Sequence, residues 1–269
     1  MKEQTINLRE IYDREKENLY RVVTNDPVEF LQRYKENRNI EIAGFLASQF
    51  AYGKIDTFKK FLRTLFELMG DNPYEFIKRG KFSALSKLYY RFQKGKDIVL
   101  LFHTLKRILD EYGSIGMMLK SLYNEDIRST LWAVREHFFG NGNELIFFFP
   151  KRSNTNPLKR WNLYLRWMVR KDEIDVGIWN FIDKRDLIIP LDTHLFKIGQ
   201  CLGWTKCKTP SSKAACEITE VLKAISPEDP LKYDFFLCHM VGIRAGCTGR
   251  KSQVCAGRCV LVGSSAIDI

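Results

Sequence analysis

The sequence lacks long apolar runs, internal repeats and low-complexity segments. No stretch approaches the roughly 20 apolar residues that cross a bilayer, so we expect no membrane-spanning helix and no membrane partner. No repeat of the length found in solenoids or propellers is visible, which argues against both. The first residues are charged rather than apolar, unlike a secretory leader. These absences predict a cytoplasmic globular protein.

Cysteine is missing from the first 200 residues. All seven cysteines lie between Cys201 and Cys259. A disulfide framework for the whole chain is therefore excluded, and reduced thiols or a local metal site are expected instead.

The alternating apolar pattern of a half-buried strand is also missing. Apolar residues instead recur at helical spacing from Ile55 to Met69, followed by the stop signal Gly70-Asp71-Asn72-Pro73. Similar patterns predict helices at about 40–52, 97–112, 127–139, 158–170, 193–202, 211–225 and 233–242. The predicted fold class is all-α.

A segment rich in Asn, Gly and Pro, 141–156, predicts a connection between two helical lobes. The chain is long enough to bury a sizeable core. We expect one monomeric unit over 1–269, with a central cleft between a lobe at 40–150 and a lobe formed by 1–39 and 151–269.

Charge is unevenly distributed. Lys and Arg outnumber Asp and Glu by 43 to 32, which gives a net charge of +11. Residues 151–213 hold 13 basic and 6 acidic side chains, which is +7 of that excess. Clustered positive charge favours a polyanionic partner, although a basic surface can also serve solubility alone.

The segment from Pro190 to Ile198 is a turn followed by an amphipathic helix, with Asp192 at its start. Asp192 is expected to cap that helix. A carboxylate held there stays ionised beside the positive end of the helix dipole. Cleavage of a glycosidic bond requires such a fixed negative charge, because positive charge develops on the sugar.

A second helix start lies upstream at Asn156-Pro157-Leu158-Lys159. Its apolar residues form one face, whereas Lys159, Asn162, Arg166 and Arg170 form the other. Two interpretations stay open: a solvated basic face that contacts phosphates, or an amine nucleophile at Lys159 whose pKa is lowered by its surroundings.

Residues 189–198, followed by Cys201-Leu202-Gly203-Trp204, resemble the V-D-T-H-hydrophobic segment of endonuclease III and its helix-hairpin-helix relatives. The resemblance implies that Asp192 is catalytic and that Lys159 is the lysine nucleophile of bifunctional members. It implies a nucleoid-associated base-excision-repair DNA glycosylase with abasic-site lyase activity. The implied substrate is a damaged base in duplex DNA.

Further segments are similar to this superfamily. Residues 45–49 resemble its L-L-S-x-Q helix, and residues 89–92 resemble the tyrosine-arginine segment of oxoguanine-type members. Residues 159–170 and 177–179 resemble a related, uncharacterised group of bacterial and archaeal proteins, DUF2400. The expected DNA- or base-binding residues are Gln49, Arg91, Arg160, Arg166, Arg170, His194 and Asp234.

The sequence departs from the family pattern in two places. No Gly-rich hairpin precedes Lys159, and the interval to Asp192 is longer because residues 172–186 are inserted. Asp192 could then activate water in a monofunctional enzyme. The alternative class is a non-catalytic nucleic-acid-binding protein on the same scaffold.

Cys247, Cys255 and Cys259, with Cys238 or His239 nearby, suggest a metal site because the superfamily often ends in an iron-sulfur loop. The spacing does not match that loop. Unligated cysteines are the other interpretation, and the proposed chemistry needs no cofactor.

Overall fold

The computed structural model describes residues 7–20 and 26–262. The chain divides into two compact units. Unit 1 comprises Met1–Thr24, Asn154–Arg166 and Asp183–Ile269, and unit 2 comprises Asn25–Ser153 and Trp167–Ile182. These units differ from the expected lobes, because residues 25–39, 151–153 and 167–182 belong to unit 2.

The fold is all-α, as the sequence predicts. Within the described residues, the strands are a single antiparallel pair of two residues each. None of the helices in this part of the chain has the length and apolar character needed to span a membrane.

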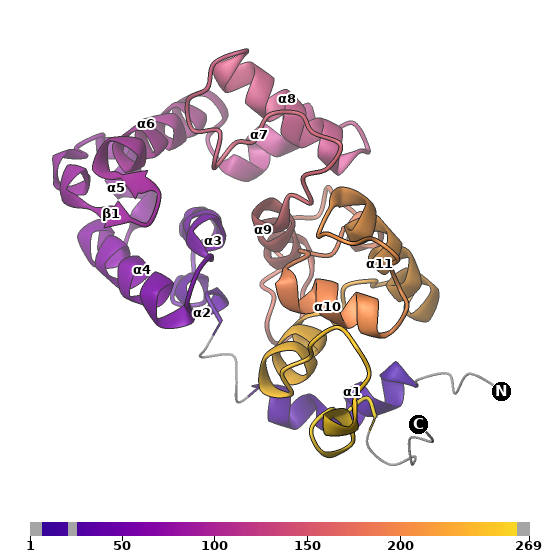
Figure 1. Ribbon diagram of the computed structural model, residues 1–269. Coiled ribbons are helices and arrows are strands. Elements are labelled where there is room, and N and C mark those ends of the chain that lie inside the picture. The colour runs from indigo at the N-terminus through magenta and orange to yellow at the C-terminus, as the bar shows by residue number, and fades with distance from the viewer. Residues whose placement is uncertain (1–6, 21–25, 263–269) are drawn as a thin grey trace. The chain divides into compact units, whose positions relative to one another are not determined.

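Unit 2 is built around helix α3 (Asn37–Phe50), whose residues are buried along almost its whole length. Helix α3 contacts α2, α4, α5 and α7 (Figure 1). The other elements of the unit are α2 (Val28–Leu31), α4 (Ile55–Met69), α5 (Pro73–Arg79), the 3-10 helix η2 (Ser83–Lys87), β1 (Tyr89–Tyr90), β2 (Gln93–Lys94), α6 (Gly95–Tyr112), α7 (Ile115–Leu122) and α8 (Ile127–Phe139).

Local signals in the sequence set the ends of these helices. Asn72 caps α5 by accepting from the Glu75 amide at 3.1 Å, and Pro73 occupies the first turn. Gly80 then ends the helix in the left-handed conformation. Polar caps of this kind satisfy amide groups that the first helical turn leaves without partners.

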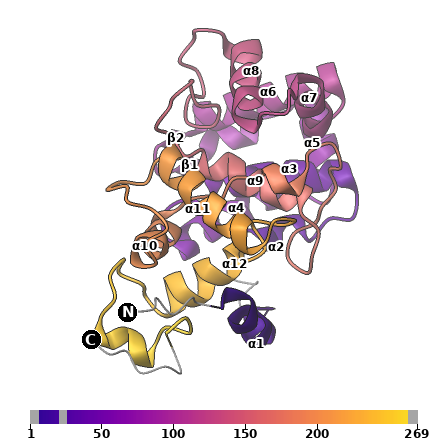
Figure 2. The same ribbon diagram turned by 90° about the vertical axis from the view of Figure 1, so that its right-hand side faces the viewer.

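Unit 1 contains most of α9 (Lys159–Val169), together with α10 (Thr193–Cys201) and α11 (Ser212–Ile225). Its other elements are α1 (Leu8–Tyr20), the short 3-10 helices η3 (Lys184–Asp186) and η5 (Gln253–Gly257), α12 (Asp234–Phe236) and the π-helix η4 (Leu237–Arg244). Helix α12 continues directly into η4 and packs against α1 (Figure 2). The π-helix also packs against α10, which carries Asp192 at its start.

Candidate functional site

Asp192 is the N-cap of α10, as the sequence predicts, and both of its carboxylate oxygens are engaged. Oδ1 accepts from the Leu195 amide at 2.8 Å. Oδ2 accepts from the Cys238 thiol, with a sulfur-oxygen distance of 3.7 Å. Asp192 is half-buried. Two donors from two helical elements therefore fix this carboxylate.

The π-helix η4 supplies the second donor because it lies very close to α10. A Cβ atom at Gly242 would stand 2.7 Å from the Cβ of His194. Only glycine permits this approach, and it keeps the Cys238 turn beside Asp192. Single π-turns recur at functional sites in proteins. The role of Cys238 as a partner of Asp192 could not be derived from the sequence. The sequence suggests Cys238 only as a candidate metal ligand.

His194 is half-buried beside Gly242. It therefore contributes to the packing of α10 against η4. The contact of His194 with DNA is still a prediction.

Lys159 is the first residue of α9 and belongs to unit 1, as does Asp192. The Asn156 side chain accepts from the Leu158 amide at 2.9 Å, and the Asn162 side chain donates to the Pro157 carbonyl at 2.9 Å. Both Lys159 and Arg160 are half-buried. These bonds fix the entry to the helix and thus the starting point of the Lys159 side chain.

Leu158 adopts a left-handed backbone, with φ +53°, although it is buried and not a glycine. Such a conformation is uncommon for a non-glycine residue and often marks a strained functional position. It lies directly before Lys159, where the glycosylase pattern places glycines. The missing glycines therefore do not prevent a left-handed turn at this position.

Arg166 and Asp234 form a buried ion pair within unit 1. Nη1 of Arg166 donates to Oδ2 of Asp234, and the two side chains are 4% and 2% exposed. The guanidinium also lies 5.9 Å from the centre of the Phe235 ring. The structure thus brings together Arg166 and Asp234, two of the predicted DNA- or base-binding residues, but they bind each other in the interior.

Arg170 is likewise buried and paired, within unit 2. It donates to Asp175, and also to Asp172 at 2.9 Å. Asp172 in turn accepts from the amides of Ile174 and Asp175 at 2.9 and 2.7 Å. The inserted segment 172–186 therefore carries the counter-charges of Arg170.

The interpretation of the polar side of α9 as a solvated basic face is wrong. Asn162, Arg166 and Arg170 are each at most 4% exposed. Phosphate contacts by the two arginines stay predictions, and they would require the guanidinium groups to leave their carboxylate partners.

Gln49 and Arg91, both in unit 2, lie in opposite environments. Gln49 is in α3 and has no exposed surface. Arg91 is exposed at the turn between β1 and β2. Of these two predicted DNA-binding residues, Arg91 is therefore accessible in this conformation and Gln49 is not.

The cysteines near the C-terminus influence one another. Burial, together with the neighbouring thiols of Cys247, Cys255 and Cys259, raises the pKa of the Cys201 thiol to about 11. Among residues 7–20 and 26–262, however, no three His, Cys, Asp or Glu side chains are arranged so that they could hold a metal ion.

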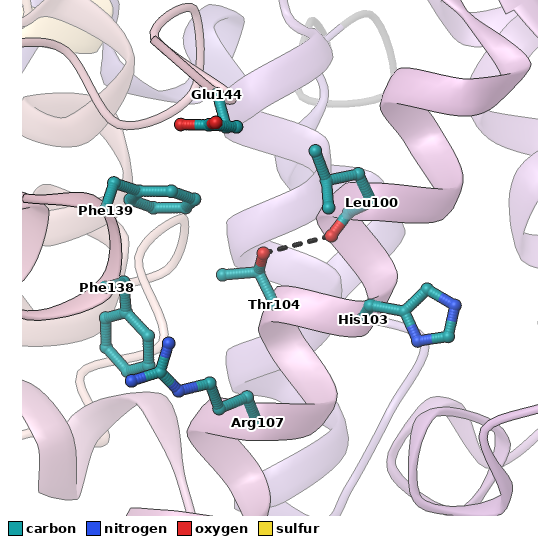
Figure 3. A pocket seen from close by; sticks show the side chains of 7 residues that line it. All are labelled: Leu100, His103, Thr104, Arg107, Phe138, Phe139 and Glu144. Atoms are coloured by element: carbon teal, nitrogen blue, oxygen red, sulfur yellow. Dashed lines mark hydrogen bonds between the residues drawn. The ribbon is translucent and has the colours of Figure 1, made fainter. Parts of the chain in front are cut away.

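A shallow cavity of about 450 Å³ lies in unit 2 between α6 and the end of α8 (Figure 3). Arg107 covers the Phe138 ring at 4.8 Å, and Thr104 donates to the Leu100 carbonyl at 3.0 Å. His103 and Glu144 also line it, but no residue of the predicted site does. The predicted catalytic residues therefore do not line this cavity.

The model of the family described as "Protein of unknown function (DUF2400)" matches residues 26–244. No curated protein and no solved structure matches the chain. The matched region begins just before α2 and ends with the π-helix, so it includes Lys159, Asp192 and Cys238. Because this region covers most of the sequence, the chain belongs to the DUF2400 family of proteins of unknown function.

Proposed function

We propose that this protein is a DNA glycosylase of the helix-hairpin-helix type, which removes a damaged base from duplex DNA. The observation that supports it is the fixation of Asp192 by the Leu195 amide and the Cys238 thiol. A carboxylate held in this way can stabilise the positive charge that develops on the sugar as the base leaves. The resemblance of residues 189–198 to the catalytic segment of endonuclease III supports a catalytic role for this fixed carboxylate.

In the proposed reaction Lys159 acts as the nucleophile. Its neutral amine forms a bond to the anomeric carbon while the bond to the base breaks, and the base leaves with that electron pair. Asp192 relays the proton released by the amine toward the departing base. The sugar ring then opens to a Schiff base, from which β-elimination cleaves the DNA strand.

A monofunctional route uses the same Asp192 without Lys159. Asp192 would accept a proton from a water molecule, and the resulting hydroxide would attack the anomeric carbon while the bond to the base breaks; the base leaves with that electron pair and takes up the proton. The products are a free base and an intact abasic strand. Strand cleavage therefore distinguishes the two routes.

Borohydride trapping tests the proposal directly. Duplexes that contain oxoguanine, hypoxanthine, uracil, thymine glycol or an abasic site are incubated with the native protein and with Lys159→Ala, Asp192→Asn and Lys197→Ala. Lys197 is an exposed residue of α10 and serves as the matched control. We expect a covalent adduct with the native protein and Lys197→Ala, and none with Lys159→Ala.

Asp192→Asn is expected to lower base release by several orders of magnitude while it leaves DNA binding intact. Base release without an adduct would support the monofunctional route. The absence of both from every duplex would contradict the glycosylase proposal.

The second candidate function is a non-catalytic nucleic-acid-binding protein on the same scaffold. The pairing of Asp234 with Arg166 favours it, because this carboxylate is then engaged in the interior rather than presented to a base. This candidate predicts salt-dependent binding to DNA and no chemistry on any of the five duplexes.

A further inference from the structure

The hairpin of β1 and β2 has a short, unusual tip. Tyr89 pairs with Lys94 and Tyr90 with Gln93, so Arg91 and Phe92 alone form the turn. Arg91 has a positive φ of +52°, which a two-residue hairpin turn normally assigns to glycine. The chain thus keeps a large cationic side chain at a position where glycine is favoured.

The inward side of the hairpin anchors it firmly to unit 2. The Tyr90 ring stacks on Phe61 with centroids 4.8 Å apart. The Tyr90 hydroxyl donates to the Tyr52 carbonyl, and the Tyr52 hydroxyl donates to the Tyr90 carbonyl at 3.4 Å. At the far end of the hairpin, a Cβ atom at Gly95 would collide with the Ser86 carbonyl. These contacts hold the tip in one orientation.

The outward side presents aromatic rings. Tyr89 is 66% exposed and Phe92 is 69% exposed, more than any other large apolar side chain of the described residues. The Phe92 ring is parallel to that of Tyr52, with centroids 6.4 Å apart and an interplanar angle of 5°. The Arg91 guanidinium lies 5.5 Å from the Phe92 centroid and 5.7 Å from the Tyr52 centroid. Flat aromatic and cationic groups therefore share this surface.

The charge around the tip has one sign. From Gly80 to Lys96 the sequence has five basic residues and no acidic residue. All five are exposed: Lys81, Lys87, Arg91, Lys94 and Lys96. Among the described residues, Arg91 forms no ion pair, and its guanidinium contacts aromatic rings instead. This positive charge is thus available to an anionic partner.

We propose that this hairpin tip binds single-stranded DNA by stacking unpaired bases on Tyr89 and Phe92. Exposed aromatic rings within a basic surface are the combination with which proteins bind single strands without sequence preference. Bases of an intact duplex have their faces covered by neighbouring pairs, so the rings require unpaired bases. Arg91, Lys87 and Lys94 contact the phosphates. The choice of DNA over RNA rests on the proposed function, but binding requires none of its chemistry.

The test is a fluorescence anisotropy titration with a labelled, undamaged single-stranded DNA oligonucleotide. We expect Phe92→Ala to weaken binding about 5- to 150-fold, the effect of losing one stacked base. Phe92→Trp keeps a ring for stacking and should bind like the native protein. Met117→Ala removes an exposed apolar side chain elsewhere in unit 2 and should change nothing.

Salt dependence separates the charged contacts from the stacking. Arg91→Ala should reduce the slope of log affinity against log salt concentration by about 0.7, the value for one phosphate contact on a single strand. Phe92→Ala should leave that slope unchanged. Lys120→Ala, an exposed lysine of α7, is the control for charge.

Three results would overturn the proposal. They are equal binding of the single strand by Phe92→Ala and Met117→Ala, an equal loss of affinity for the matching duplex and for the single strand in Phe92→Ala, and tighter binding of the matching RNA strand. Asp192→Asn separates this proposal from the enzymatic one, because it should lower base release by several orders of magnitude and leave the oligonucleotide affinity unchanged.

Discussion

Arginine side chains lie in opposite environments in two basic regions of the molecule. Arg166 in α9 and Arg170, directly after the end of that helix, are buried, and each is paired with a carboxylate. Arg91, at the tip of the β1–β2 hairpin, is exposed and lies over aromatic rings without an ion pair among the described residues. Basic composition along a sequence therefore does not locate basic surface, because buried carboxylates can neutralise a cluster.

The difference follows from the cost of burying charge. A guanidinium taken out of water without a partner costs several kcal/mol. Arg166 avoids this cost through Asp234, which lies 68 residues further along the chain. Arg91 stays hydrated and needs no carboxylate. The first arginine therefore serves the fold, and the second remains free to serve binding.

The largest expected effect is the difference in the free energy of unfolding between two arginine-to-alanine variants, one in each region. Arg166→Ala leaves Asp234 buried without its cation and should lower the free energy of unfolding by about 3–5 kcal/mol. Arg91→Ala should leave the free energy of unfolding nearly unchanged. Urea denaturation of both variants measures the difference, and equal losses would break the comparison.

A smaller effect is expected where α10 and η4 touch. Gly242→Ala would place a methyl group against His194 and should lower the free energy of unfolding by about 1–3 kcal/mol. Gly257→Ala is the control, because a methyl group there meets no atom within 4 Å. If the two variants unfold at the same denaturant concentration, the packing of η4 against α10 is not tight.

Glu41 is a buried acid that, unlike Arg166, is held by neutral hydrogen-bond donors rather than by an opposite charge. It accepts from the Trp179 indole at 2.8 Å and from the Gly116 amide at 3.2 Å. Burial raises its pKa above 4.5 despite these bonds. The folded state then binds a proton more tightly than the unfolded state, so stability is greatest below pH 4.5 and falls as the pH rises through the raised pKa.

Glu41→Gln cannot ionise and should lack this dependence. The gap in unfolding free energy between native protein and variant should therefore shift in favour of the variant as the pH rises from 4.5. A constant gap across this range would contradict a raised pKa at Glu41.

The smallest expected effect concerns the backbone of the hairpin tip. Arg91→Gly relieves a left-handed conformation and should change the free energy of unfolding by about 1 kcal/mol or less, in the stabilising direction. The same variant should bind single-stranded DNA more weakly. A clear loss of stability would show that Arg91 serves the fold, as Arg166 does.

The amphipathic helices were predictable from the sequence. Predicted bounds for α4 and α8 agree with the structure, because apolar spacing, Gly70 and Gly140 mark their ends. Helices α1, α2, α5 and α7 were not predicted. They are short or rich in charge, so their periodicity is weak, and tertiary packing stabilises them.

The candidate site was only partly predictable. The cap at Asp192 follows from its local sequence. The Cys238 thiol beside it does not, because that contact joins residues 46 positions apart. The β1–β2 hairpin also escaped prediction, since two residues per strand are too few to show alternation.

The sequence by itself determined the all-α class, the principal amphipathic helices and the cap at Asp192, because these depend on residues within a turn or two of each other. Only the tertiary structure decided which charges are available. It buried Arg166 with Asp234 and exposed Arg91, because burial depends on long-range packing, which local sequence does not contain.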